Sequence, residues 1–220
     1  MDRRQELANN LAQVRGKIPA DRTLIVVTKT FPVSDAQILY QLGERNFAEN
    51  RDSEGSLKSE QLPEDVIWHY QGEIQSQKIR SIVGWADYIH SVDELRHAAK
   101  IGEIARESEK LQKIFLQISL DPQPGSRGGI DPSNLDAITE QILAIDGIEL
   151  CGVMGIAPLE GDPARAFAHL QALSDQVCHL APHATAISAG MSGDFEIALR
   201  FGATHLRIGS SILGSRSAPL

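Results

Sequence analysis

A lysine that directly follows a buried strand is the residue of this sequence with the clearest chemical potential. Lys29 comes immediately after the apolar run LIVVT (24–28), so we expect its amine at or just inside the edge of a sheet or barrel. Lost solvation there lowers the pKa of a lysine, and the neutral amine is a nucleophile that forms Schiff bases with carbonyl compounds. The alternative interpretation is a lysine whose stem lies along the strand end while its ammonium group reaches solvent.

Two loops near the end of the sequence are rich in glycine and serine. The segment RIGSS (207–211) combines these residues with a short helical start, and the backbone N–H groups of such a segment bind phosphate. The segment SAGMSGD (188–194) offers a second set of donors. Each loop also has a purely structural interpretation as the serine N-cap of a following helix, with Asp194 complementing the helix dipole.

Other polar residues near the ends of apolar runs carry weaker signals. His69 and His90 lie in or beside apolar strands, which is typical of interior, hydrogen-bonded histidines, and their spacing does not indicate a metal site. Asn50 either lines a site or begins a helix as its N-cap. The loop 121–129, which contains Arg127, is expected to be solvated. The sequence contains neither a Walker A segment nor G-x-G-x-x-G, so nucleotide binding by those routes is not supported.

Eight apolar runs of strand length alternate with helical segments after an opening helix at 2–16, where Leu7, Leu11 and Val14 form an apolar stripe. This alternation favours a parallel sheet, because parallel strands need crossover connections, which are usually helices. It predicts a single domain over 1–220, a (β/α)8 barrel with an extra N-terminal helix, and a doubly wound open sheet is the alternative. The expected strands are 24–28, 46–50, 66–72, 86–92, 113–120, 148–156, 184–190 and 204–212.

Composition excludes several classes of partner. The formal net charge is −8 and the pI is about 5.4, so nucleic acid and anionic membrane surfaces are not expected to bind. No apolar run approaches the ~18 residues of a membrane span, and the charged N-terminus lacks the apolar region of a signal peptide. The two cysteines, Cys151 and Cys178, lie far apart, which argues against a disulfide framework or a zinc site and predicts a cytoplasmic protein.

Seven short segments can be compared together, and they are VVTKT (26–30), GERNFAEN (43–50), HYQGEIQSQK (69–78), HSVD (90–93), GVMGI (152–156), SAGMSGD (188–194) and RIGS (207–210). In this order they resemble the motifs of the pyridoxal 5′-phosphate (PLP) homeostasis proteins, single-domain relatives of the barrel half of alanine racemases. The resemblance covers nearly the whole chain. Four positions depart from the family pattern: Ala48, Gln71, Gln77 and Arg127. They leave open the roles of the 69–78 segment and the 121–129 loop.

The resemblance implies that PLP is the cofactor and that Lys29 holds its aldehyde as a Schiff base. The phosphate would lie among the donors of the two glycine- and serine-rich loops, and Arg207 would face the pyridine nitrogen. An arginine does not readily give up its proton, so the ring nitrogen would stay unprotonated and the cofactor would be a weaker electron sink. The cofactor-binding residues expected from the resemblance are Lys29, Asn50, Met154, Ser188, Met191, Ser192, Arg207, Gly209 and Ser210.

The resemblance also implies a carrier rather than an enzyme. Alanine racemases have a second, β-rich domain that contributes a tyrosine acid/base, and 220 residues are expected to leave no room for it. We therefore expect a monomer without a catalytic acid–base pair that serves PLP homeostasis and passes PLP to apo-enzymes. The first alternative is a PLP-dependent amino-acid racemase or related enzyme with weak activity. The second is a phosphate-sugar isomerase or aldolase barrel that uses Lys29 without a cofactor.

Overall fold

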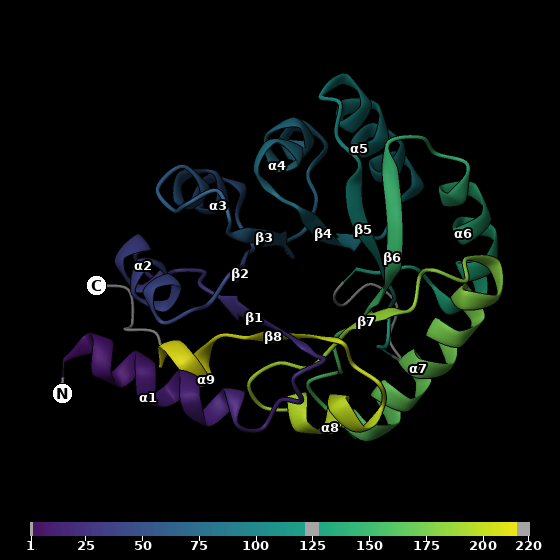
Figure 1. Ribbon diagram of the computed structural model, residues 1–220. Coiled ribbons are helices and arrows are strands. Elements are labelled where there is room, and N and C mark those ends of the chain that lie inside the picture. Colours follow the sequence, from purple (N-terminus) through teal and green to yellow (C-terminus); the bar gives the residue numbers. More distant parts are fainter. Residues whose placement is uncertain (1, 122–127, 215–220) are drawn as a thin grey trace.

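The computed structural model describes residues 2–121 and 128–214. Eight parallel strands close into a barrel in the order of the sequence, and helices surround it (Figure 1). The first strand pairs with the last, which excludes the open doubly wound sheet and confirms the (β/α)8 barrel. The strands are β1 (Thr23–Val27), β2 (Asn46–Glu49), β3 (Ile67–Tyr70), β4 (Tyr88–Val92), β5 (Gln112–Gln117), β6 (Ile148–Met154), β7 (Ala186–Ser188) and β8 (His205–Ile208).

The helices lie in the connections between these strands, and also before β1 and after β8. They are α1 (Arg3–Arg15), α2 (Val33–Gln41), α3 (Asp52–Ser59), α4 (Ile79–Trp85), α5 (Leu95–Glu107), α6 (Leu135–Leu143), α7 (Pro163–Leu180), α8 (Phe195–Arg200) and α9 (Ser210–Leu213), with 3-10 turns η1 (Ser76–Lys78) and η2 (Pro132–Asn134). The longest, α7, has 18 residues, and none of the helices in the described part of the chain combines the length and the apolar character of a membrane span.

Strand β8 closes the barrel through two seams, its pairing with β1 and its pairing with β7, and the two differ in length. Along the β1–β8 seam the paired residues run from Thr23 opposite His205 to Val26 opposite Ile208. The β7–β8 register is given by one pair, Ser188 opposite His205. A backbone hydrogen bond from the Arg207 N–H to the Gly190 carbonyl, 3.0 Å long, continues that second seam toward the loop after β7. The two glycine- and serine-rich loops are therefore neighbours at one end of the barrel.

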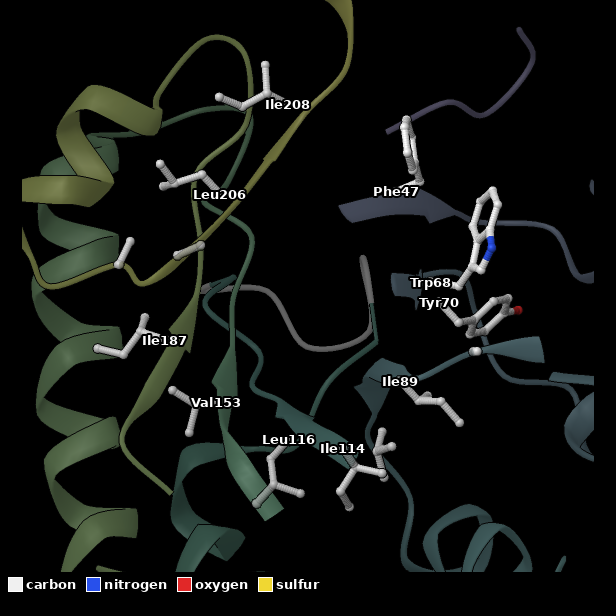
Figure 2. Close-up of a cluster of buried hydrophobic side chains, with 14 of the residues drawn as sticks. Phe47, Trp68, Tyr70, Ile89, Ile114, Leu116, Val153, Ile187, Leu206 and Ile208 are labelled. Carbon is white, nitrogen blue, oxygen red and sulfur yellow. The ribbon is translucent and has the colours of Figure 1, made fainter. Parts of the chain in front are cut away.

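Side chains alternate between the two faces of each strand, so a hydrophobic layer lies between the barrel and the helices. Figure 2 shows members of this layer, from Phe47 on β2 to Ile208 on β8. The opposite face, toward the barrel interior, holds Ile25 and Val27 but also polar residues such as Arg207. This interior is more polar than the branched aliphatic filling that is usual for such barrels.

The first and last helices lie against each other (Figure 1). The α1 residues Leu7, Leu11 and Val14 are buried, as the sequence predicts. Arg3 donates to the Leu213 carbonyl and Asn10 donates to the Ile212 carbonyl, both at 3.0 Å. Helix α1 therefore supports α9, whose first residue is Ser210.

Several expected element boundaries are wrong, mostly at the carboxyl ends of strands. The eighth strand ends at Ile208 rather than at 212, because α9 begins at Ser210. The sequence also predicts Ser34 as the N-cap of the helix that follows the first strand, but Pro32 is the N-cap of α2, since the proline already has the extended backbone that this position requires. Helix α3 begins after Arg51 and α8 after Asp194, so neither Asn50 nor Ser192 is an N-cap.

Candidate functional site

A pocket of about 310 Å³ opens at the carboxyl ends of β1 and β8, where the loop after β7 also arrives. This volume is at the lower end of the roughly 300–1,000 Å³ that small-molecule pockets occupy. The lining residues are Val27, Lys29, Phe31, Gln71, Met191, Ser192, Gly193, Arg207, Gly209, Ser210 and Gly214.

The residues predicted to bind a cofactor do not all lie on this pocket. Those that line it are Lys29, Met191, Ser192, Arg207, Gly209 and Ser210. Three others do not belong to the lining formed by the described residues. Met154 and Ser188 are buried at the carboxyl ends of β6 and β7. Asn50 follows β2, and its buried Oδ1 has no hydrogen-bond partner in the described part of the chain.

The backbone around Lys29 is held by a buried ion pair that the sequence analysis missed. Lys58 of α3 donates to the carboxylate of Glu49 at 2.6 Å and to the carbonyl of Thr28 at 2.8 Å. The Thr28 hydroxyl donates to the same Glu49 oxygen at 2.6 Å. These bonds fix the residue before Lys29 to the end of β2 and to α3. A charged residue within the apolar segment NFAE was the available signal.

Thr30, the residue after Lys29, has a left-handed backbone with φ of 68°. This conformation is unfavourable for a β-branched residue, so the surrounding structure must impose it. The carboxylate of Glu54 accepts a hydrogen bond from the Thr30 N–H at 2.7 Å. Helix α3 thus holds the backbone on both sides of Lys29, through Lys58 and Glu54.

Burial governs the electrostatics of the Glu49–Lys58 ion pair. Glu49 and Lys58 are 0 % and 4 % exposed. Removal from water raises the pKa of the Glu49 carboxyl, and the Lys58 charge and the hydrogen bonds from Lys58 and Thr28 oppose that shift. The second Glu49 oxygen is buried with no hydrogen-bond partner among the described residues. The carboxylate therefore depends on Lys58 for its stability as an ion.

Arg207 brings a buried positive charge to the floor of the pocket. Its guanidinium donates to the Ser188 hydroxyl at 2.7 Å and to the Gly155 carbonyl at 3.1 Å. Burial lowers the pKa of Arg207 to about 10, with a small opposing effect from Asp194. Because this value is still about three units above neutrality, Arg207 is a cation that donates hydrogen bonds and accepts none.

The two glycine- and serine-rich loops are joined where they meet the pocket. The N–H of Ser211 donates to the Ser192 hydroxyl oxygen at 3.1 Å. The Asp194 carboxylate accepts from the Met191 N–H at 2.6 Å, which closes the loop after β7 into a turn. At Gly209 a side chain would bring its Cβ to 3.1 Å from the Val27 carbonyl, so a glycine allows the loop after β8 to lie close to β1.

The 69–78 segment contributes to the pocket through Gln71, one of the positions that depart from the family pattern. Next to it, Gly72 lies against the end of β2, since a Cβ at this position would lie 2.0 Å from the Asn50 carbonyl oxygen. The Ser91 hydroxyl donates to the Gly72 carbonyl. The segment therefore joins the ends of three successive strands. Arg127 and most of the 121–129 loop lie outside the described residues.

Charge distinguishes this pocket from a second, larger cavity of about 670 Å³ beside the loops after β5 and β6. The first pocket is lined by the basic side chains of Lys29 and Arg207 and by no carboxylate of the described chain. The second is lined by Arg165 and His169 together with the acidic residues Asp121, Asp131, Glu160 and Asp162. Only the first pocket has a lining whose charge suits an anion. This local positive charge offsets the net charge of −8 at that place.

This barrel defines a known class of protein. A profile described as alanine racemase, N-terminal domain, matches residues 3–217. The pyridoxal phosphate homeostasis protein of Mycobacterium tuberculosis is 38% identical over 246 aligned residues, which cover 98% of this chain and 95% of the relative. That of Escherichia coli is 31% identical, covering 96% and 97%. The chain belongs to the family of pyridoxal phosphate homeostasis proteins.

Solved structures agree with this assignment. PipY of Synechococcus elongatus with PLP bound superposes with a TM-score of 0.88 at 34% identity, covering 94% of this chain and all of PipY. The same protein without PLP superposes with a TM-score of 0.90. Alanine racemase of Clostridium difficile shares the barrel fold, with a TM-score of 0.81 at 16% identity, and the match covers 58% of that chain.

Proposed function

We propose that this protein binds PLP in the pocket between β1, β8 and the loop after β7, and that it serves PLP homeostasis. The observation that carries the proposal is a single pocket in which Lys29 and Arg207 meet two loops rich in N–H and hydroxyl donors. A phosphate and an aldehyde on one small molecule use both features. The PLP-bound structure of the relative PipY supports the same identification.

Lys29 is proposed as the covalent attachment point. Its amine nitrogen attacks the aldehyde carbon, a C=N bond forms, and the aldehyde oxygen leaves as water, so the link is a Schiff base formed without any oxidant or reductant. The PLP aldehyde supplies the electrophile. The chain supplies the position of the amine, which the contacts of α3 with Thr28 and Thr30 restrict.

The other pocket residues divide into two groups under this proposal. Ser192, Gly209 and Ser210 hold the phosphate, and the bond from the Ser211 N–H to Ser192 keeps their loops together. Arg207 meets the ring nitrogen, which must stay unprotonated beside a cation that only donates hydrogen bonds. Asn50, Met154 and Ser188 support these contacts from around the pocket. An unprotonated ring is a weak electron sink, which favours storage over turnover.

The tyrosines of the chain do not favour the racemase alternative. Tyr70 donates to the Glu73 carbonyl, and burial raises its pKa to about 12. Tyr88 is stacked on His69, and Tyr40 donates to Asp65. None of them lines the described pocket, so a phenol acid or base is not provided there. We therefore propose a carrier that releases PLP to apo-enzymes.

The decisive experiment is the absorbance spectrum of the purified protein with PLP, before and after borohydride reduction. We expect a Schiff-base band that borohydride abolishes, with the reduced label on the peptide containing Lys29 by mass spectrometry. K29A should fold, as judged by circular dichroism, and should carry no label. K100A, which changes an exposed lysine of α5, is the matched control and should label fully.

Two results would overturn parts of this proposal. A protein that shows no Schiff-base band after unbound PLP is removed does not use the pocket in this way, and an adduct retained by K29A places the link on another lysine. Sustained exchange of α-protons across a panel of amino acids would identify an enzyme rather than a carrier. Delivery is tested by mixing the loaded protein with an apo-enzyme in the presence of a scavenger of free PLP, where recovered activity supports direct transfer.

A further inference from the structure

A chain of buried hydrogen bonds crosses the barrel interior behind Arg207. It runs from the Arg207 guanidinium to the Ser188 hydroxyl (2.7 Å), to His90 Nδ1 (2.8 Å), from His90 Nε2 to His69 Nδ1 (2.9 Å), and from His69 Nε2 to Asn46 Oδ1 (3.1 Å). Arg207 lines the pocket, and Asn46 is the first residue of β2 at the opposite end of the barrel. The chain therefore connects the candidate cofactor site to the far end of the fold.

With both rings neutral, as their burial favours, the Asn46 end of this chain sets the direction of the bonds as far as Ser188. Arg207 can only donate, and the Asn46 carbonyl oxygen can only accept. His69 must then carry its proton on Nε2, which leaves Nδ1 to accept from His90. His90 must likewise carry its proton on Nε2, which leaves its Nδ1 to accept from the Ser188 hydroxyl. Each link has one proton, and both histidines are neutral.

The surroundings favour this neutral arrangement. His69, His90 and Ser188 are at most 1 % exposed, and burial lowers the pKa of both histidines well below its ordinary value. The rings are packed rather than hydrated, because His90 is stacked on Phe115 with centroids 4.3 Å apart. His69 is stacked on Tyr88 in the same manner.

The titratable neighbours of the two rings act in the same direction. The ring centroid of His205, from β8, lies 6.5 Å from that of His69 and 6.3 Å from that of His90, and the pKa of His205 is itself lowered to about 4. The positive charge of Arg207 further disfavours a proton on His90. Lys113 of β5 lies over the Tyr88 ring and donates to the Tyr88 hydroxyl.

We propose that His90, His69 and Asn46 are positioning residues for Arg207 and that they act through Ser188. This inference rests on the proposed function. A hydroxyl that donates to His90 keeps its lone pairs for the guanidinium. If the His90 proton moved to Nδ1, Ser188 would receive two donors and its own proton would lack a partner. The tautomers of the two histidines therefore decide whether Arg207 has the Ser188 oxygen to itself or shares it with a second donor, and so how firmly Arg207 is held where it meets the ring nitrogen.

The first test uses the ligand-free protein, so it does not depend on PLP binding. Side-chain nitrogen-15 NMR should report both histidines as neutral rings protonated on Nε2, near neutral pH. In N46A, which removes the terminal acceptor at a half-buried position, the His69 and His90 signals should shift toward a mixture of tautomers. A proton on Nδ1 of either ring in the wild-type protein, or unchanged tautomers in N46A, would overturn the proposal.

The second test asks whether the chain acts on the ring nitrogen. PLP is compared with 1-deaza-PLP, which has C–H in place of that nitrogen. We expect S188A and H90F to weaken PLP binding by about tenfold, the effect of losing one hydrogen bond to a charged group, and to change 1-deaza-PLP binding by less than about twofold. H90N retains an acceptor near the position of Nδ1 and should recover part of the affinity for PLP.

Controls separate this role from a structural one. F115L removes the stacking partner of His90 but leaves the hydrogen-bond chain, so it should lower stability and preserve the preference for PLP over the deaza analogue. Equal weakening of both ligands by S188A and H90F would overturn the proposal and leave a structural role. If the wild-type protein binds neither ligand, the proposed function fails, and the NMR result still decides the state of the chain.

Discussion

Replacing Lys58 by methionine should destabilise the protein more than replacing any exposed charged residue does. Lys58 and Glu49 are 2.6 Å apart and almost fully buried. At an effective dielectric constant of about 20, two unit charges at that distance attract by about 6 kcal/mol, and desolvation of both ions offsets part of it. Removing one partner leaves a buried, unpaired carboxylate, and we expect K58M to lower the free energy of unfolding by about 3–5 kcal/mol.

The loss in K58M should depend on pH in a defined direction. Burial raises the pKa of Glu49 above its ordinary value of 4.5, and without Lys58 the pKa rises further. A raised carboxyl pKa means that the folded chain keeps a proton that the unfolded chain releases. The free energy of unfolding of K58M therefore falls as the pH rises above about 4.5, through the folded pKa, and the deficit is smaller in acid than near pH 8.

Urea unfolding of three variants across this pH range tests the reasoning. The double variant E49Q/K58M removes both charges and should recover much of the stability, with little pH dependence, because no buried ion remains. K100M breaks the exposed Lys100–Glu103 pair on α5 and should change stability by less than about 0.5 kcal/mol. A K58M protein within about 1 kcal/mol of wild type near pH 8, or a double variant as unstable as K58M, would refute the argument.

Three further predictions concern the phosphate loops, the acid response and the first helix. S192A should weaken PLP binding by about tenfold and leave the binding of pyridoxal, which has no phosphate, unchanged in equilibrium dialysis; equal losses would contradict the phosphate assignment. His205 has a pKa of about 4 when folded and 6.5 ordinarily, so the unfolded chain binds its proton first, and the free energy of unfolding should fall as the pH drops from 6.5 to 4. H205N should show a smaller fall, and an identical fall would assign the effect to other groups. L7A should lower the free energy of unfolding by about 2–5 kcal/mol in urea, because Leu7 is fully buried on α1, a helix that packs against α9 and α2.

Much of the barrel could be predicted because its signals are local. The segment TLIVV gives the first strand, and the glycine and serine residues around Ser192 and Ser210 indicate the two loops that line the pocket and that we propose hold the phosphate. The ends of the elements were harder to predict from the sequence, because the polar residues that follow each strand resemble its last residues. Strand β8 shows this, because the sequence alone does not separate Ile208 from the helix that begins at Ser210.

The remainder of the site depends on contacts between distant segments. Glu49 and Lys58 pair across the space between a strand and a helix, and nothing in their spacing distinguishes them from two surface charges. His69, His90 and Ser188 come together only because three strands point the same face into the barrel. The sequence indicated interior histidines, which the structure confirms, but their partners follow from the barrel register.

The contact between α1 and α9 has a consequence for how the protein is made. Arg3 and Leu213 are 210 positions apart in the sequence, and Lys29 precedes Ser210 by 181 residues. A chain emerging from the ribosome exposes Lys29 long before the residues that would hold a phosphate exist. The barrel cannot close, and α1 cannot bind α9, until the last strand is synthesised. Lys29 thus spends most of translation without the residues that complete its pocket, and we expect that only a chain whose last strand is in place can retain the cofactor.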